Sequence, residues 1–270
     1  MRKQLLFAAC LLLAVLMTGL CACAGHPADV PAEPPVTSPA AESPVPEAAP
    51  EENEPSPGQA AEAIPVFQAA LEQVLTSHIL PDGTDCGYEE LMDDGGNRFA
   101  VYDVDGDGKD ELVILYTTTY MAGQTAGVFG YDETTKALTP ELIEHPLLTF
   151  YTNGSIRADW SHNQGLSVSF WPYTLYRYES ASDSYQAAGM ADAWEKAFAP
   201  TDYDGNPYPD EVDVSGTGIV YFLMPGGEVS EVSPVDATAY EAWRSANLGD
   251  ATEVQLPYQP LTREAIEQLG

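Results

Sequence analysis

The sequence predicts an α+β domain made mainly of antiparallel hairpins, with a packing helix before the strands and further helices after them. Two patterns lead to this prediction. Through the middle of the chain, short runs rich in β-branched and aromatic residues alternate with turn-forming residues. Apolar residues at helical spacing occur before and after these runs. Short strands joined by tight turns favour antiparallel pairing, because parallel strands need long crossover connections.

The domain is expected to begin with a helix in the stretch "IPVFQAALEQVLTSHIL". Pro65 suits the first helical turn, where its missing N–H group leaves no helical bond unmade. His78 falls on the apolar face, and we expect it to be a histidine of the core or its rim and not a ligand. The other residues of that face recur at helical spacing: Phe67, Ala70, Leu71, Val74 and Leu75.

Strands are predicted next along the chain. "FAVYDV" and "ELVILYTTTY" flank an acidic loop, and "AGVFGYD" follows them. The turn Asn153-Gly154 is the strongest hairpin signal in the sequence. Two further hairpins are expected, one turning near Ser182-Asp183 and one at residues 225–227. Consecutive hairpins of this kind form a meander.

Helical patterns return near the C-terminus. In "SPVDATAYEAWRSANLG" we expect Ser233 to be the N-cap residue, with Pro234 at the first helical position, Asp236 three residues on and Gly249 just past the end. The final stretch, "VQLPYQPLTREAIEQLG", predicts a short edge strand and a last helix capped by Thr262.

Residues 1–22 are typical of a secretion signal, because a positively charged start precedes an apolar run that is too short to span a membrane. The run ends in "LCACAG", where Leu20, Ala22 and Cys23 resemble the bacterial lipobox. The resemblance implies that Cys23 is lipidated and anchors the protein to the extracytoplasmic face of the cell membrane. The alternative is an ordinary signal-peptidase cleavage after residue 24, which would release a soluble protein.

Residues 23–60 follow the signal as a disordered linker. Ten of the residues from 24 to 60 are proline and none is aromatic, so the segment cannot bury enough apolar surface to fold. Proline-rich chains are extended, and we expect this linker to hold one globular domain, residues 61–270, away from the membrane. Cys86 is the single cysteine of that domain, so an internal disulfide is excluded and a small buried residue is expected.

The chain is strongly acidic, with a formal net charge of −32 at pH 7. Such a surface repels phosphate backbones, so nucleic acid is excluded as a partner, and it attracts cations. The acids crowd most closely in "DVDGDGKDE", residues 103–111.

Residues 103–111 follow the pattern D-x-D-x-D-G-x-x-[DE], which is typical of calcium-binding loops. Alternate aspartates in a tight loop can turn their carboxylates toward one centre, and Gly108 allows the bend that presents a backbone carbonyl. Without a divalent ion, carboxylates this close would repel one another. The predicted ligands are Asp103, Asp105, Asp107, the carbonyl of Lys109 and Glu111.

This loop resembles the calcium loops of EF-hands and of FG-GAP propeller blades. It is not a full EF-hand, because Ile114 stands at the twelfth position and a strand replaces the exiting helix. A propeller is not expected, since the chain has one clear copy of the loop. All the loop oxygens come from a segment that joins two apolar strands, so we expect a structural calcium ion that pins this hairpin. The second strand of the hairpin, residues 112–116, is expected to be buried on both faces.

A second stretch, "TDYDGNPYPDEVD", repeats part of the same spacing. Pro207 stands where the loop needs a glycine. We therefore expect at most a weak cation site there, and turns formed by the Asp-Gly and Asn-Pro pairs are the alternative. The candidate ligands are Asp202, Asp204, Asn206 and Asp210.

The chain contains none of the catalytic or nucleotide-binding motifs H-E-x-x-H, G-x-S-x-G, S-x-x-K, C-x-x-C and the P-loop. Asp159, Ser161 and His162 lie close together, but a turn explains these residue types equally well. Most of the aromatic residues nearby are expected to cover a thin core. For Trp160 and Trp171 both roles are left open, packing in the core and contact with a ligand. An enzyme is therefore not the expected outcome.

The layout of lipobox, proline-rich linker and a head with one acidic loop resembles many uncharacterised bacterial surface lipoproteins. That resemblance implies a location and a metal but no activity. We expect a monomeric, membrane-anchored module with a structural calcium site that binds a cell-wall, glycan or protein ligand without catalysis. The alternative is a cell-wall or glycan hydrolase or a carbohydrate-binding protein, which a cleft with two carboxylates beside a tryptophan would favour.

Overall fold

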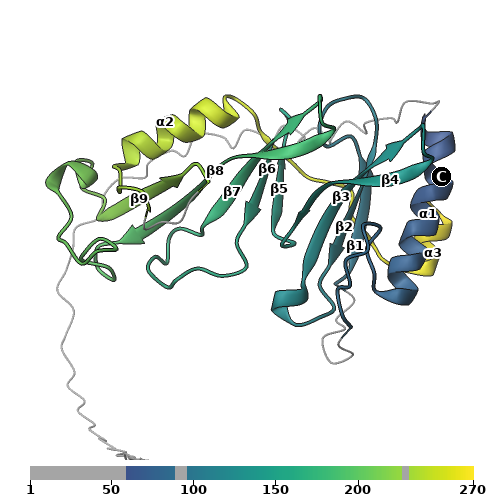
Figure 1. Ribbon diagram of the computed structural model, residues 1–270, viewed down its shortest axis with the longest axis horizontal. Coiled ribbons are helices and arrows are strands. Elements are labelled where there is room, and N and C mark those ends of the chain that lie inside the picture. The colour runs from purple at the N-terminus through teal and green to yellow at the C-terminus, as the bar shows by residue number, and fades with distance from the viewer. Residues whose placement is uncertain (1–58, 89–95, 227–230) are drawn as a thin grey trace, which may run out of the picture. The chain divides into compact units, whose positions relative to one another are not determined.

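The computed structural model describes residues 59–88, 96–226 and 231–270. The predicted secretion signal, Cys23 and nearly all of the linker lie outside these ranges. The described part of the chain is an α+β domain with two antiparallel sheets, an N-terminal helix and C-terminal helices, as the sequence predicts (Figure 1). None of its helices is long and apolar enough to cross a membrane.

The first sheet has five strands in the order β11-β1-β2-β3-β4. Strands β1 to β4 follow one another as antiparallel hairpins, and β11 joins the outer edge of β1. The acidic loop is therefore the connection between two neighbouring strands of this sheet. The strands are β1 (Arg98–Tyr102), β2 (Glu111–Tyr116), β3 (Thr125–Asp132), β4 (Ala137–Glu144) and β11 (Gln259–Pro260).

The second sheet has six strands in the order β10-β5-β6-β7-β8-β9. The predicted turns at Asn153-Gly154 and Ser182-Asp183 connect β5 to β6 and β7 to β8. The strands are β5 (Leu148–Tyr151), β6 (Ile156–Asp159), β7 (Tyr173–Glu179), β8 (Ser184–Glu195), β9 (Ile219–Met224) and β10 (Glu253–Val254).

Helices α1 (Gln59–Ser77) and α3 (Arg263–Glu267) lie side by side against the first sheet (Figure 1). The Nε2 group of Gln68 in α1 donates to the carbonyl of Ile266 at 3.1 Å and so ties the two helices together. Thr262 caps α3, as predicted, by accepting a hydrogen bond from the N–H of Ala265. The apolar face of α1 forms one core with the sheet: Phe67, Leu71, Val74, Leu112, Ile114 and Phe129.

The opposite face of the first sheet packs on the second sheet. Side chains along a strand alternate between its two faces, so Val113 of β2 points away from α1 and into a second core. That core also contains Phe150, Ile156 and Tyr185 of the second sheet. Leu112 and Val113 are both 0% exposed, which confirms that β2 is buried on both faces.

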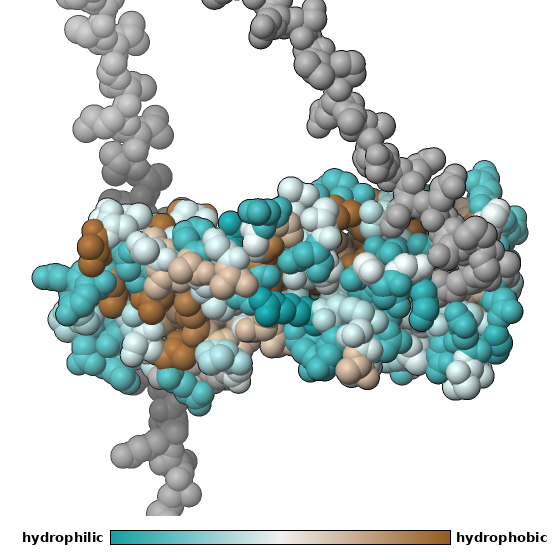
Figure 2. Space-filling model, turned by 90° about the horizontal axis from the view of Figure 1, so that it is seen from above, coloured by the Kyte–Doolittle hydropathy of each residue, from teal (hydrophilic) through white to brown (hydrophobic). Residues whose placement is uncertain are grey.

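Helix α2 (Ala237–Leu248) packs on the second sheet through Tyr240 and Leu248. Figure 2 shows apolar residues reaching the surface toward the end of the domain that carries α2 and β9, whereas hydrophilic residues cover much of the other end. The most exposed large apolar side chains in this half are Val168 and Val214, at 83% and 76%.

The N-cap of α2 differs from the prediction. Asp236, not Ser233, is the cap, and its side chain accepts a hydrogen bond from the N–H of Thr238. The helix begins later because Val235 stays extended and exchanges backbone hydrogen bonds with Tyr221 of β9. The C-terminal prediction is confirmed, since the helix ends at its glycine cap, residue 249.

Strand β4 was not predicted, because Pro140 interrupts its sequence. Proline is tolerated there, since β4 is an edge strand and one side of its backbone needs no partner.

The predicted strand after the turn at residues 225–227 lies partly outside the described residues. Strand β9, which precedes that turn, pairs with β8.

Candidate metal site

The loop between β1 and β2 folds around its first aspartate. The Oδ1 and Oδ2 atoms of Asp103 accept hydrogen bonds from the N–H groups of Gly106 and Gly108, at 2.7 and 3.1 Å. Both glycines have positive φ, 82° and 89°, which bends the chain back toward the carboxylate. The local sequence alone therefore curls the loop around Asp103.

The next two aspartates make the same kind of local bond. Asp105 Oδ1 accepts from the N–H of Asp107, and Asp107 Oδ1 accepts from the N–H of Lys109, both at 2.8 Å. Aspartates favour such turns because the side chain reaches the backbone two residues on. The exposed ammonium group of Lys109 lies 3.6 Å from Asp107 Oδ2. A role for the carbonyl of Lys109 as a ligand stays a prediction.

Glu111 closes the loop from the first position of β2. It is only 2% exposed, and its Oε2 accepts a hydrogen bond from the N–H of Val104 at 2.9 Å. Burial, with added repulsion from Asp105 and Glu141, raises the pKa of Glu111 to about 10. A carboxyl group with this pKa keeps its proton at neutral pH unless a nearby cation favours the charged form.

Three predicted ligands converge on one point. Asp103, Asp105 and Glu111 each offer a carboxylate oxygen, and these oxygens lie within 4.8 Å of one another. Oxygens that bind one calcium ion at about 2.4 Å can be at most twice that distance apart. We call these residues the inner set. The inner set could hold a metal ion.

A second group shares Asp105 with the inner set. Asp105, Asp107 and Asp183 also place carboxylate oxygens within 4.8 Å of one another, and we call them the outer set. Asp183 lies in the β7–β8 turn with a φ of 50°, and its Oδ1 accepts a hydrogen bond from the hydroxyl of Tyr178 at 2.6 Å. The sequence pointed to Asp183 only as a turn residue, because nothing local links it to the distant acidic loop.

Glu141 of β4 is a further acid beside the loop that the sequence analysis missed. It is 6% exposed, and its Oε2 is buried without a hydrogen-bond partner among the described residues. Burial, with repulsion from Asp105, Asp183 and Asp107, raises the pKa of Glu141 to about 8. The signal in the sequence was a glutamate among apolar residues in "PELIE". It would have stood out only if this stretch had been predicted to be an edge strand.

Asp105 is the residue at which these groups meet. Its side chain is half-buried, and its Oδ2 has no hydrogen-bond partner within the described ranges. Burial raises the pKa of Asp105 to about 6, and repulsion from Asp107 and Asp103 acts in the same direction. A divalent cation would offset the repulsion and would give Asp105 Oδ2 the partner that it lacks.

The second acidic stretch behaves as a turn. Asp202 Oδ1 accepts a hydrogen bond from the N–H of Asn206 at 2.7 Å, and the carbonyl of Asp202 accepts one from Gly205. Asp204 and Asp210 are exposed. Within the described part of the chain, the acids of this stretch form no group of three with oxygens inside 4.8 Å. A weak cation site here stays a prediction.

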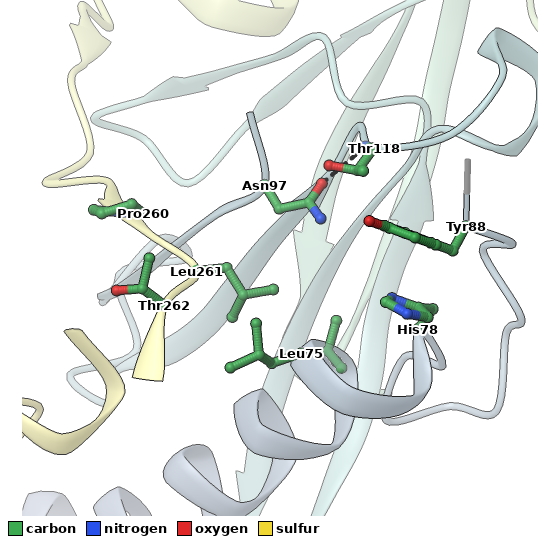
Figure 3. A pocket seen from close by; sticks show the side chains of 9 residues that line it. Leu75, His78, Tyr88, Asn97, Thr118, Pro260, Leu261 and Thr262 are labelled. Atoms are coloured by element: carbon green, nitrogen blue, oxygen red, sulfur yellow. Dashed lines mark hydrogen bonds between the residues drawn. The ribbon is translucent and has the colours of Figure 1, made fainter. Parts of the chain in front are cut away.

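A cavity of about 350 Å³ lies where the C-terminal end of α1 meets the segment around β11 (Figure 3). Asn97 faces it, and its Oδ1 accepts hydrogen bonds from the N–H groups of Thr117 and Thr118. His78 and Tyr88 lie close together at the rim (Figure 3). Their rings stack, with centroids 4.5 Å apart. His78 is half-buried, and its Nδ1 lies 2.9 Å from the hydroxyl of the core residue Tyr116, as expected of a histidine at the rim of the core. None of the described residues that line the cavity carries a carboxylate.

Asp159, Ser161 and His162 do not form one hydrogen-bonded group within the described part of the chain. Ser161 Oγ and His162 Nδ1 lie 3.1 Å apart, but Asp159 pairs with Arg157 at 2.6 Å. Trp160 is half-buried in a local core. The Nε1 group of Trp171, which is 38% exposed, donates to the carbonyl of Trp160.

Comparisons of this chain with known protein families, with curated proteins and with solved structures found no match.

Proposed function

We propose that this chain is a lipid-anchored extracytoplasmic protein whose head domain binds calcium through the β1–β2 loop and serves as a non-catalytic surface binding module. The convergence of the inner set carries the proposal. It combines three carboxylate oxygens within 4.8 Å of one another with a buried Asp105 oxygen that has no partner in the described part of the chain.

The chemistry of the donors favours calcium over other metals. Both sets consist of carboxylates alone, with no histidine or cysteine. Hard oxygen ligands suit calcium and magnesium, whereas zinc and copper favour nitrogen and sulfur. Magnesium keeps most of its water and demands near-octahedral geometry, while calcium accepts six to eight oxygens in a flexible arrangement. A loop crowded with carboxylates therefore fits calcium better.

A structural role follows from where the loop lies. It joins β1 to β2, and β2 is the buried strand on which both α1 and the second sheet pack. An ion that holds this connection stabilises the hairpin at the centre of the domain. Among the described residues, neither the lining of the 350 Å³ cavity nor the two sets in the loop include a tryptophan beside two carboxylates, the arrangement that a glycan hydrolase would favour.

Titration calorimetry of the purified protein with calcium, magnesium and zinc tests the metal. We expect calcium to bind more tightly than the other two ions, and thermal melting to shift upward in calcium relative to a chelator. Equal melting temperatures in both conditions would refute the site. Metabolic labelling with a fatty acid, lost in a Cys23→Ala variant, tests the anchor.

A further inference from the structure

The geometry points to a second cation position, formed by the outer set of Asp105, Asp107 and Asp183, that ties the β7–β8 hairpin of the second sheet to the acidic loop of the first. This inference rests on the proposed calcium binding of the loop. It adds a second ion, a ligand from outside the loop and a role in joining the two sheets.

The distances keep the two positions separate. Asp183 belongs to the outer set, while Asp103 and Glu111 belong to the inner set, and no group within the described residues combines Asp183 with either of them. One ion cannot therefore bind all five carboxylates in this geometry. Asp105 belongs to both sets, so its carboxylate would bridge two neighbouring ions, as carboxylates do in two-metal sites.

Glu141 provides an independent observation. It belongs to neither set, yet its Oε2 is buried and has no hydrogen-bond partner in the described part of the chain. Its Oε1 lies against Gly130 of β3, in space that a Cβ atom on residue 130 would fill. The charges that act on Glu141 include those of Asp105, Asp183 and Asp107, which are the members of the outer set. A cation bound near Glu141 would give this Oε2 atom the partner that it lacks and would compensate the charge of the carboxylate.

The charge balance also favours two ions. The two sets, Glu141 and Lys109 together contribute six carboxylates and one ammonium group, a net charge of −5 when all are ionised and the nearby Asp110 is left out of the count. One divalent ion leaves −3, and two leave −1. Uncompensated charge is costly for Glu111 and Glu141, which are buried, and for Asp105, which is half-buried. The groups are Asp103, Asp105, Asp107, Glu111, Glu141, Asp183 and Lys109.

The position of Asp183 determines what a second ion would do to the fold. The turn that carries it connects β7 to β8, and Tyr185 of β8 already packs in the core between the sheets. The hydrogen bond from Tyr178 holds the Asp183 carboxylate in place. An ion in the outer set would therefore cross-link two turns from different sheets, as a disulfide would between two cysteines.

The test is the number of calcium ions bound by the full chain and by an Asp183→Asn variant in titration calorimetry. Asparagine tolerates the positive φ at this position and still accepts the hydrogen bond from Tyr178. We expect two ions in the parent and one in Asp183→Asn, with the affinity of the remaining ion changed less than about threefold. Glu133→Gln, which removes an exposed charge near Lys109 without touching either set, should still bind two ions.

Other results would overturn the inference. A parent that binds a single ion, or an Asp183→Asn variant that still binds two, removes the second position but leaves the proposed loop site intact. Loss of one ion in Asp202→Asn and not in Asp183→Asn would assign the second ion to the other acidic stretch. A parent that binds no calcium refutes the proposed function itself. Thermal melting in chelator checks that each variant is folded. If Asp183→Asn does not fold, Asp183→Gly takes its place, because glycine tolerates the positive φ at this position.

Discussion

Gly154 of the β5–β6 turn lies directly against the backbone carbonyl of Asp105, so closely that a Cβ atom at residue 154 would be 2.5 Å from that oxygen. The strongest hairpin signal in the sequence therefore serves a second purpose. Its glycine allows the turn, with a φ of 75°, and it also lets the second sheet approach the acidic loop of the first.

Replacing Gly154 with alanine should destabilise the domain and weaken calcium binding, because the added methyl group pushes the Asp105 backbone out of place. Gly165→Ala is the matched control. Its φ is 70°, but no atom lies within 4 Å of the added Cβ. We expect the control to lose about 1 to 2 kcal/mol of unfolding free energy from backbone strain alone. Urea denaturation should show a larger loss for Gly154→Ala, and equal losses would contradict the close approach.

Asp105→Asn should abolish the stabilisation by calcium. The amide oxygen can still accept the hydrogen bond from the N–H of Asp107, so the loop keeps its turn but loses the charge shared by both sets. At a calcium concentration about ten times the dissociation constant, the parent gains about 1.4 kcal/mol. The variant should gain none, and in chelator it should be at least as stable as the parent because a repulsive charge is gone. Urea denaturation in both conditions measures the two quantities.

The metal-free protein should lose stability as the pH rises. Glu141 has a folded-state pKa of about 8, against about 4.3 in an unfolded chain. Between these values the folded state holds a proton that the unfolded state releases, so stability is greatest below the lower value and falls toward the higher one.

Melting curves in chelator from pH 5 to pH 9 check this expectation. Glu141→Gln should show a smaller fall than the parent, because its side chain no longer titrates. Glu133→Gln, an exposed acid on the β3–β4 turn, should follow the parent. A melting temperature that rises over this range in chelator would show that the buried acid is charged without a metal.

Asp236→Ala should lower the melting temperature, whereas Ser233→Ala should leave it nearly unchanged. The Asp236 carboxylate accepts hydrogen bonds from the N–H groups of Ser215 and Thr238, which hold its pKa well below the usual range. The loss in Asp236→Ala should disappear as the pH falls far enough to protonate the parent's carboxylate. A lower melting temperature in Ser233→Ala would support the prediction from the sequence that Ser233 caps this helix.

The sequence by itself determined the local structure of this protein. The continuous apolar run at residues 112–116 placed β2, the Asn153-Gly154 pair placed a hairpin, and Thr262 placed the start of the last helix. The spacing of the aspartates also determined the loop, because each side chain bonds to backbone only a few residues away. These features depend on short-range interactions, which a local stretch of sequence contains in full.

Only the tertiary structure decided what surrounds the loop. Glu141 and Asp183 come from strands and turns that lie far along the chain from Asp105, and their approach depends on the pairing of β4 with β3 and on the packing of the two sheets. Strand β4 escaped prediction because its Pro140 is acceptable only at an edge, which no local pattern specifies. The predicted start of α2 was wrong for a similar reason, since residue 235 pairs with a strand of the second sheet. Long-range pairing is a property of the whole fold, so it sets the composition of the site beyond the loop.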